Sequence, residues 1–134
     1  MGDPLIIAGT RPELIKIAPI AQALKRLRIR FRFLYTGQHY DHELSQTFIR
    51  ELGLPEPDYD LGVKAGRSAT LTGKVVVRTG EAIRELDPGL ALVQGDTNTA
   101  LAATIAAIKE NVPVGHVESG LRSYDWRMPE EHNR

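Results

Sequence analysis

The sequence predicts an α/β fold: a doubly wound, Rossmann-like parallel sheet with helices on both faces. Segments of strand character alternate with segments of helical character along the 134 residues. The strand segments are apolar throughout, which is typical of strands that are buried on both faces. Because crossovers between parallel strands are right-handed, we expect the first strand in the centre of the sheet, with the chain reversing direction beside it.

Four strands and four helices are expected. The strands are predicted at residues 5–8, 31–36, 90–94 and 112–117. The helices are predicted at residues 12–28, 43–52, 68–86 and 98–110. The stretch 55–66 has proline, aspartate and glycine spaced through it and is predicted to be irregular.

Pro19 interrupts the pattern of the first helix. Leu14, Ile17 and Ala21 recur there at helical spacing. Proline cannot donate a backbone hydrogen bond, and its ring clashes with the carbonyl of Ile15 in a regular helix. We expect either a kink at Pro19 or a second helix that begins near it.

The overall composition favours a cytoplasmic globular domain. The 17 basic and 17 acidic residues cancel, so no strong field favours nucleic acid or an anionic membrane as a partner. The sequence has no cysteine, no targeting signal after Met1 and no apolar run of the roughly 18 residues that a membrane span needs. Residues 39–43 (HYDHE) lack a histidine pair at i and i+4 and an obvious third ligand, so we expect no metal site.

Polar residues follow three of the predicted strands. These segments are residues 9–13 (GTRPE), 95–99 (GDTNT) and 118–122 (ESGLR). Ligands of open parallel sheets bind at the carboxyl ends of the strands, near the point where the strand order reverses. We therefore expect the three segments to share one rim, with a cation in the first and a carboxylate in each of the others.

The first of these segments has the features of an anion site. Gly9 allows a tight turn and the close approach of a phosphate. Thr10 and Glu13 have capping-box spacing, so the free N–H groups of the next helix would face the rim. Arg11 adds a planar guanidinium, and Lys16 lies about a turn further along. The alternative is a well-capped helix with an ordinary surface arginine.

Carboxylates are the candidate catalytic groups of the other two segments. Asp96 lies at a strand end, where a carboxylate would meet a ligand, although helix capping also explains residues of this type. Glu118 closes the strand that contains His116. A histidine inside an apolar strand is more simply a hydrogen-bonded core residue than a catalyst, so Glu118 is the better candidate.

The final segment, residues 124–134, is polar, and no predicted helix follows it to cover the sheet. A four-stranded sheet that ended here would leave a strand edge uncovered. We interpret the chain as truncated, the alternative being a short flexible tail. Glu130 and Glu131 lie in this segment, where a solvated pair of charges is the simplest interpretation.

At these residues the chain resembles one family, the non-hydrolysing UDP-N-acetylglucosamine 2-epimerases. The matches keep the order and spacing of the family's motifs along nearly the whole chain, so together they are highly specific. They are residues 9–13 (GTRPE), Lys16, 18–19 (AP), 36–39 (TGQH), 57–61 (PDYDL), 95–97 (GDT), 113–118 (PVGHVE), 120–122 (GLR) and 129–134 (PEExNR).

The resemblance implies a two-domain fold of the glycosyltransferase-B type, with the active site in the cleft between two Rossmann-like halves. Residues 1–134 would be the N-terminal domain, and the C-terminal domain, which supplies most contacts to UDP in the family, would be absent. The resemblance also implies a homodimer for the full-length protein and no NAD or other cofactor. We therefore expect the 134-residue chain alone to be inactive.

The implied reaction interconverts UDP-N-acetylglucosamine and UDP-N-acetylmannosamine. UDP leaves C1 of the sugar while the C2 proton departs, which gives 2-acetamidoglucal, and UDP adds back after reprotonation of the other face. Such chemistry needs cations at the leaving diphosphate and carboxylates near the ring.

The resemblance assigns a role to each candidate residue. The residues that would bind the phosphates are Thr10, Arg11 and Lys16. The residues that match the family's catalytic carboxylates are Asp96, Glu118 and Glu130. Gln38 and His39 match a segment that helps to form a second, regulatory UDP-N-acetylglucosamine site in bacterial members.

Two other functions are compatible with this sequence. One is a nucleotide-sugar-binding half-domain without turnover, and the other is the N-terminal half of a glycosyltransferase that shares the fold. The carboxylates of Asp96 and Glu118 favour the epimerase, because glycosyl transfer does not exchange the C2 proton.

Overall fold

The computed structural model describes residues 2–37, 42–64 and 66–134 and contains one parallel sheet. Its strands are β1 (Pro4–Ala8), β2 (Arg32–Tyr35), β3 (Tyr59–Asp60), β4 (Leu90–Gln94) and β5 (Val114–Val117). Their order is β3-β2-β1-β4-β5, and every pair is parallel. The first strand is central and the order reverses beside it, so the doubly wound α/β prediction is confirmed.

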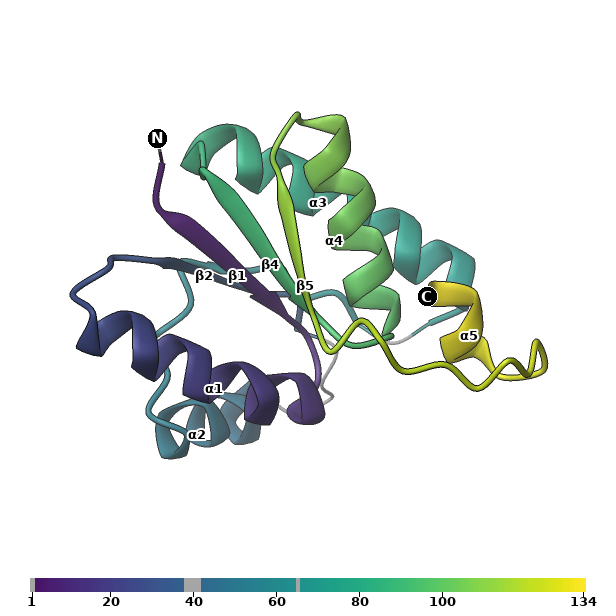
Figure 1. Ribbon diagram of the computed structural model, residues 1–134, viewed down its shortest axis with the longest axis horizontal. Coiled ribbons are helices and arrows are strands. Elements are labelled where there is room, and N and C mark those ends of the chain that lie inside the picture. Colours follow the sequence, from purple (N-terminus) through teal and green to yellow (C-terminus); the bar gives the residue numbers. More distant parts are fainter. Residues whose placement is uncertain (1, 38–41, 65) are drawn as a thin grey trace.

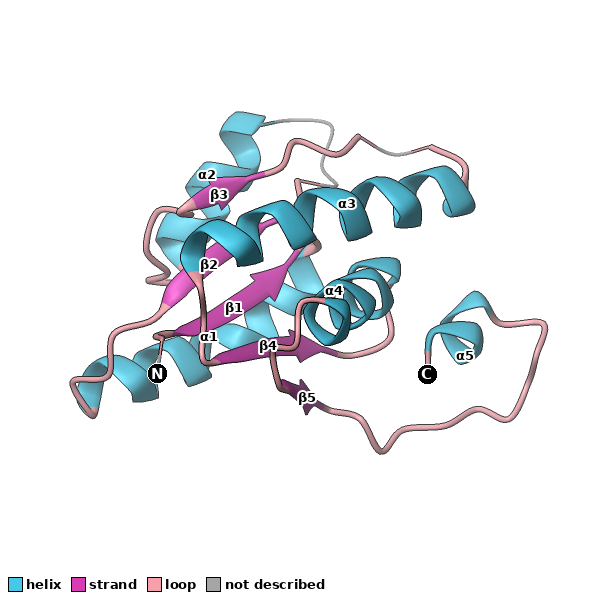
Figure 2. Ribbon diagram, turned by 90° about the horizontal axis from the view of Figure 1, so that it is seen from above, coloured by secondary structure: helices cyan, strands magenta, loops and turns pink. Residues whose placement is uncertain are grey.

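Helices cover both faces of this sheet. They are α1 (Arg11–Arg26), α2 (His42–Glu51), α3 (Ser68–Leu86) and α4 (Asn98–Lys109), and a further short helix, α5 (Pro129–Asn133), belongs to the final segment. Figures 1 and 2 show α1 and α2 against one face and α3 and α4 against the other. Because side chains alternate between the faces of a strand, Ile6 and Phe33 pack with α1 and α2. Leu5, Ile7 and Leu34 pack with α3 and α4 in a second buried cluster.

The short strand β3 corrects the prediction of an irregular stretch at 55–66. Tyr59 and Asp60 pair with Leu34 and Tyr35 of β2. Asp58 aligns the two segments, because its carboxylate accepts the Phe33 N–H at 2.8 Å and its own N–H donates to the Phe33 carbonyl at 2.8 Å. A strand of two residues is too short to show an apolar pattern in the sequence.

The helix α1 runs without a break through Pro19, so the expected second helix is not present. Pro19 is exposed, and Ile15, whose carbonyl loses its partner at the proline, is 50% exposed. Solvent on this side of the helix can hydrate the backbone where the hydrogen bond is missing. The apolar residues on the other side keep their packing, and the helix continues.

The final segment forms an arm that folds back onto the domain and ends in α5. The chain leaves β5, runs away from the sheet and returns to form α5 beside the start of α4 (Figure 2). Asn133 anchors α5 there, because its amide donates to the backbone carbonyl of Asp96 at 2.8 Å and lies 3.3 Å from the side-chain oxygen of Asn98. Among the described residues, no helix is both long enough and apolar enough to cross a membrane.

Candidate functional site

A cavity of about 610 Å³ lies at the carboxyl ends of β1, β4 and β5. Its walls come from the start of α1, the β4–α4 loop, the segment after β5, and α5 with the residue that follows it. The lining residues with charged or hydroxyl side chains are Thr10, Glu13, Lys16, Asp96, Thr97, Glu118, Glu130 and Arg134. The structure therefore brings the three polar segments that follow the strands to one rim.

Gly9 lies in the turn after β1, where buried side chains leave no room for a Cβ atom. A Cβ atom at this position would lie 1.9 Å from Thr36 Oγ1 and 2.7 Å from Thr99 Oγ1. These two hydroxyls are buried and form a hydrogen bond of 3.1 Å beneath the loop. Glycine is thus required here by the close approach of two threonines, whether or not a ligand is bound.

Glu13 forms the predicted capping box and extends it. Its Oε1 accepts from the Gly9 N–H at 3.2 Å and from the Thr10 hydroxyl at 2.9 Å, while its own N–H donates to Thr10 Oγ1 at 3.4 Å. Its Oε2 accepts from the Thr97 hydroxyl in the β4–α4 loop at 3.1 Å. Burial raises the pKa of the Glu13 carboxyl to about 7, although these hydrogen bonds act to lower it.

Asp96 is not the cap of α4, so its carboxylate is available to the cavity. Thr97 is the cap, because its hydroxyl accepts from the Ala100 N–H at 3.1 Å. Gly95 turns the chain at the end of β4 with φ +72°, a left-handed conformation that suits glycine. The Asp96 carboxylate is ion-paired with Arg134, which comes from the far side of the cavity.

Glu118 adopts a strained backbone conformation at the end of β5. Its φ of 60° lies in the left-handed region, which costs a residue with a side chain about 1–3 kcal/mol. Two partners hold its carboxylate: Gln94 donates from Nε2 at 2.5 Å, and Lys16 Nζ lies 3.5 Å away. The strain and both contacts occur at the edge of the cavity.

Glu130 and Glu131 have different environments, which corrects the prediction of a solvated pair. Glu130 is exposed and lines the cavity. Glu131 is 2% exposed and contacts Arg122, Ser123 and Arg134. The Ser123 backbone N–H and the Arg122 guanidinium lower the pKa of the Glu131 carboxyl to about 2. Glu131 is therefore an ionised anchor for the arm that places Arg134.

Several candidates from the sequence lie outside this cavity. The Arg11 guanidinium lies over the Phe48 ring of α2, 5.3 Å from its centroid, and is not among the lining residues. Its role in binding phosphate stays a prediction. Gln38 and His39 lie outside the described residues. His116 is hydrogen-bonded as expected, with Nε2 2.6 Å from the Gly95 carbonyl, but it is exposed and does not belong to the core.

Gln94 and Arg134 are cavity residues that were not predicted from the sequence. Gln94 is a polar residue at the end of an otherwise apolar strand, which was the available signal. Arg134 stands four positions after Glu130, one turn further along, so both residues reach the same cavity. The position of the arm that carries Glu130 and Arg134 could not be predicted without the tertiary structure.

The cavity combines binding and proton-transfer chemistry. Its described cations are Lys16 and Arg134, and α1 and α4 both begin at its edge. Such groups suit an anionic ligand. The carboxylates of Asp96, Glu118 and Glu130 come from three separate segments, so they can approach a ligand from several directions, whereas Glu13 is buried. No group of three or more metal-ligating side chains occurs in the part of the chain that the structure describes.

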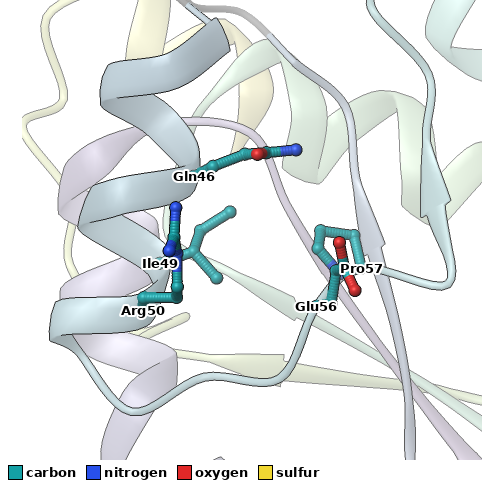
Figure 3. Close-up of a pocket in the computed structure, with 5 residues that line it drawn as sticks. All are labelled: Gln46, Ile49, Arg50, Glu56 and Pro57. Atoms are coloured by element: carbon teal, nitrogen blue, oxygen red, sulfur yellow. The ribbon is translucent and has the colours of Figure 1, made fainter.

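A second cavity of about 390 Å³ lies between α2 and the segment before β3. Figure 3 shows Gln46, Ile49 and Arg50 on the helix opposite Glu56 and Pro57. It contains one cation and one carboxylate and none of the residues predicted for the site. We therefore assign the functional site to the cavity at the strand ends.

Comparison with known proteins identifies the family. The family described as UDP-N-acetylglucosamine 2-epimerase matches residues 22–134. The UDP-N-acetylglucosamine 2-epimerase of Methanocaldococcus jannaschii is 44% identical over 129 residues, which are 96% of this chain and 35% of that protein. The UDP-2,3-diacetamido-2,3-dideoxy-D-glucuronate 2-epimerase of Pseudomonas aeruginosa is 40% identical over 131 residues, or 97% of this chain and 37% of that protein.

A solved structure gives the same result. The crystal structure of the Methanocaldococcus jannaschii UDP-GlcNAc 2-epimerase in complex with UDP-GlcNAc and UDP matches with a TM-score of 0.93 and 43% identity. The match covers 98% of this chain and 36% of that one, so the chain spans about a third of the length of these relatives. The matching family, the sequence identity and the shared structure agree: the chain belongs to the UDP-N-acetylglucosamine 2-epimerase family.

Proposed function

We propose that this chain forms one wall of the active site of a UDP-N-acetylglucosamine 2-epimerase that interconverts UDP-N-acetylglucosamine and UDP-N-acetylmannosamine. One observation carries the proposal. Asp96, Glu118 and Glu130, from three separate segments, line the same cavity as Lys16 and Arg134. Epimerisation by elimination and re-addition of UDP needs both kinds of group.

The proposed roles follow from the charges. In the forward direction the C2–H bond and the C1–O bond of the sugar break. The proton passes to a carboxylate and UDP leaves as an anion, which gives 2-acetamidoglucal. A second carboxyl group, in its protonated form, then donates a proton to the opposite face of C2, and UDP adds back at C1. Lys16, Arg134 and the start of α1 would stabilise the diphosphate as its charge develops.

We also propose that catalysis needs more than the 134 residues. The epimerase relatives are almost three times as long as the segment that matches this chain. In this proposal residues 1–134 are the N-terminal domain, and a second domain completes the UDP site. The working enzyme would be a cytoplasmic homodimer that requires no cofactor.

The proposal is tested with the 134-residue chain and with the protein translated to the natural stop codon. Each is incubated with UDP-N-acetylglucosamine, and UDP-N-acetylmannosamine is followed by NMR. UDP-2,3-diacetamido-2,3-dideoxy-D-glucuronate is assayed in parallel, because a relative at 40% identity carries this substrate in its name. Turnover of the first substrate by the longer protein alone supports the proposal. Binding without turnover by the longer protein would overturn it in favour of a binding module.

A further inference from the structure

We propose that Glu13 is a positioning residue for Asp96. Its ionised carboxylate ties the N-cap of α1 to the N-cap of α4 and thereby holds the β4–α4 loop at the cavity. The inference rests on the proposed function, because it gives the Asp96 loop a part in the reaction. It adds a residue whose effect is transmitted through hydrogen bonds and not by contact with the reacting atoms.

The geometry exceeds what a capping box requires. A capping box joins a helix residue to the cap of its own helix, and the bonds from Glu13 to Gly9 and Thr10 do this. The bond from the Thr97 hydroxyl comes from a residue 84 positions away, on the neighbouring strand's loop. The same Thr97 oxygen accepts the Ala100 N–H, so one hydroxyl caps α4 and binds Glu13. Asp96 is the residue immediately before it.

The ionised form of Glu13 matches this set of partners. Its two oxygens accept from three donors: the Gly9 N–H, the Thr10 hydroxyl and the Thr97 hydroxyl. A protonated carboxyl carries a hydrogen on one oxygen and has fewer acceptor sites and no charge, so protonation weakens its hydrogen bonds to these donors. With the carboxyl pKa at about 7, this change would occur near neutral pH.

The charges around Glu13 come from every segment that borders the cavity. The charged and titratable groups that share the cavity with Glu13 are Lys16, Asp96, Glu118, Glu130 and Arg134. Tyr35, beneath the loop, also interacts electrostatically with Glu13 and with Arg11. His116, which contacts the Gly95 carbonyl, is a further titratable group beside the β4–α4 loop. A pH effect must therefore be assigned to Glu13 by substitution.

Three variants of the protein translated to its stop codon separate positioning from simple folding support. Glu13→Gln keeps the size of the side chain and removes its charge. Thr97→Ser keeps the hydroxyl, and Thr97→Val removes it. Glu110→Gln is the control, because Glu110 pairs with Arg84 beyond the far end of α4.

The first readout is the pH dependence of kcat and KM. Glu13→Gln is expected to lower kcat about tenfold with KM within about twofold, and to remove the part of the kcat profile that titrates near neutral pH. Thr97→Val should reproduce the fall in kcat, whereas Thr97→Ser and Glu110→Gln should stay within about twofold of the parent. A lower melting temperature of Glu13→Gln with unchanged kcat and pH profile would overturn the proposal.

The second readout does not depend on activity. In protein labelled with ¹⁵N-threonine, the amide signals of Thr10 and Thr97 are expected to shift together with a midpoint near pH 7, and the common shift should vanish in Glu13→Gln. A shift of Thr10 alone would make Glu13 a cap of α1 only and overturn the proposal. Coupled shifts in a protein without epimerase activity would reject the proposed function and leave the coupling intact.

Discussion

Arg134, just beyond α5, is ion-paired with Asp96 in the loop after β4. Its other terminal nitrogen lies 3.2 Å from Glu131, which is buried and also holds Arg122 and Ser123. The arm after β5 therefore brings a cation to the carboxylate at the end of β4. Both residues line the cavity.

Removing the Arg134 cation should weaken ligand binding. Arg134 and Lys16 are the two cations of the described cavity lining, and a charge-assisted bond to phosphate is worth about 1.5–3 kcal/mol. Arg134→Gln in the longer protein is expected to raise KM for the UDP-sugar about tenfold or more. The matched control is Arg127→Gln, because Arg127 pairs with Asp125 and does not line the cavity. Equal effects of the two substitutions on KM would contradict the assignment.

The left-handed backbone at Glu118 should make glycine more stable than alanine at this position. Both substitutions remove the carboxylate with its bonds to Gln94 and Lys16, so they differ mainly in backbone strain. Glu118→Gly is expected to exceed Glu118→Ala in free energy of unfolding by about 1 kcal/mol. Urea unfolding of the two variants measures this difference, and both should lack epimerase activity. Greater stability of the alanine variant would refute the strain.

Any side chain at Gly9 should disrupt the loop. The Cβ atom of Gly9→Ala would lie 1.9 Å from Thr36 Oγ1, so the variant is expected to lose about 2 kcal/mol or more of folding stability. Removal of that oxygen in Gly9→Ala/Thr36→Ala relieves the shortest contact. The double variant should then be more stable than the sum of the single effects predicts, as a double-mutant cycle measures. Strict additivity would show that the two residues do not clash.

The Glu13 carboxyl should make folding stability fall as the pH rises. Its pKa is raised from 4.5 to about 7 by burial, so the folded state holds the proton more tightly than the unfolded state. This contribution is complete below about pH 4.5 and is lost as the pH rises to about 7. From about pH 5 to about pH 8, the wild type is expected to lose about 2–3 kcal/mol relative to Glu13→Gln in urea unfolding. Parallel pH curves would contradict the shift.

Most of the fold could be predicted from local patterns. Apolar runs that end at Gly9 or Gly95 mark strands. The prediction of a helix at 68–86 matches α3, and Asp87, the residue that follows it, has a left-handed conformation. The two-residue β3 has too few residues to show periodicity. Pro19 is tolerated because it lies on an exposed helix face, a property that only the packed structure reveals.

Two signals predicted residues of this cavity: the sheet topology for residues near the strand ends, and the family resemblance for Glu130. Asp96, Glu118 and Lys16 reach the cavity because the topology places the ends of β1, β4 and β5 together. Arg11 belongs to the same motif, yet its side chain stacks on Phe48, a contact between two helices that no motif encodes. Glu130 and Glu131 are identical neighbours in the sequence, but only Glu131 contacts Arg122, so their environments could not be told apart from the sequence.

In the proposed reaction, the carboxylates of this cavity move the C2 proton of a UDP-sugar. Deuterium incorporation at C2 tests it most directly, with UDP-N-acetylglucosamine and the protein translated to its stop codon in deuterated water. The wild type is expected to place deuterium at C2 and form UDP-N-acetylmannosamine. Asp96→Asn should have a melting temperature within about 4 °C of the wild type, because the ion pair that it breaks is partly exposed. It should incorporate no deuterium, because the carboxylate that takes part in the proton transfer is lost. No exchange by the wild type would refute the epimerase activity, and near-normal exchange by Asp96→Asn would remove Asp96 from the proton transfer.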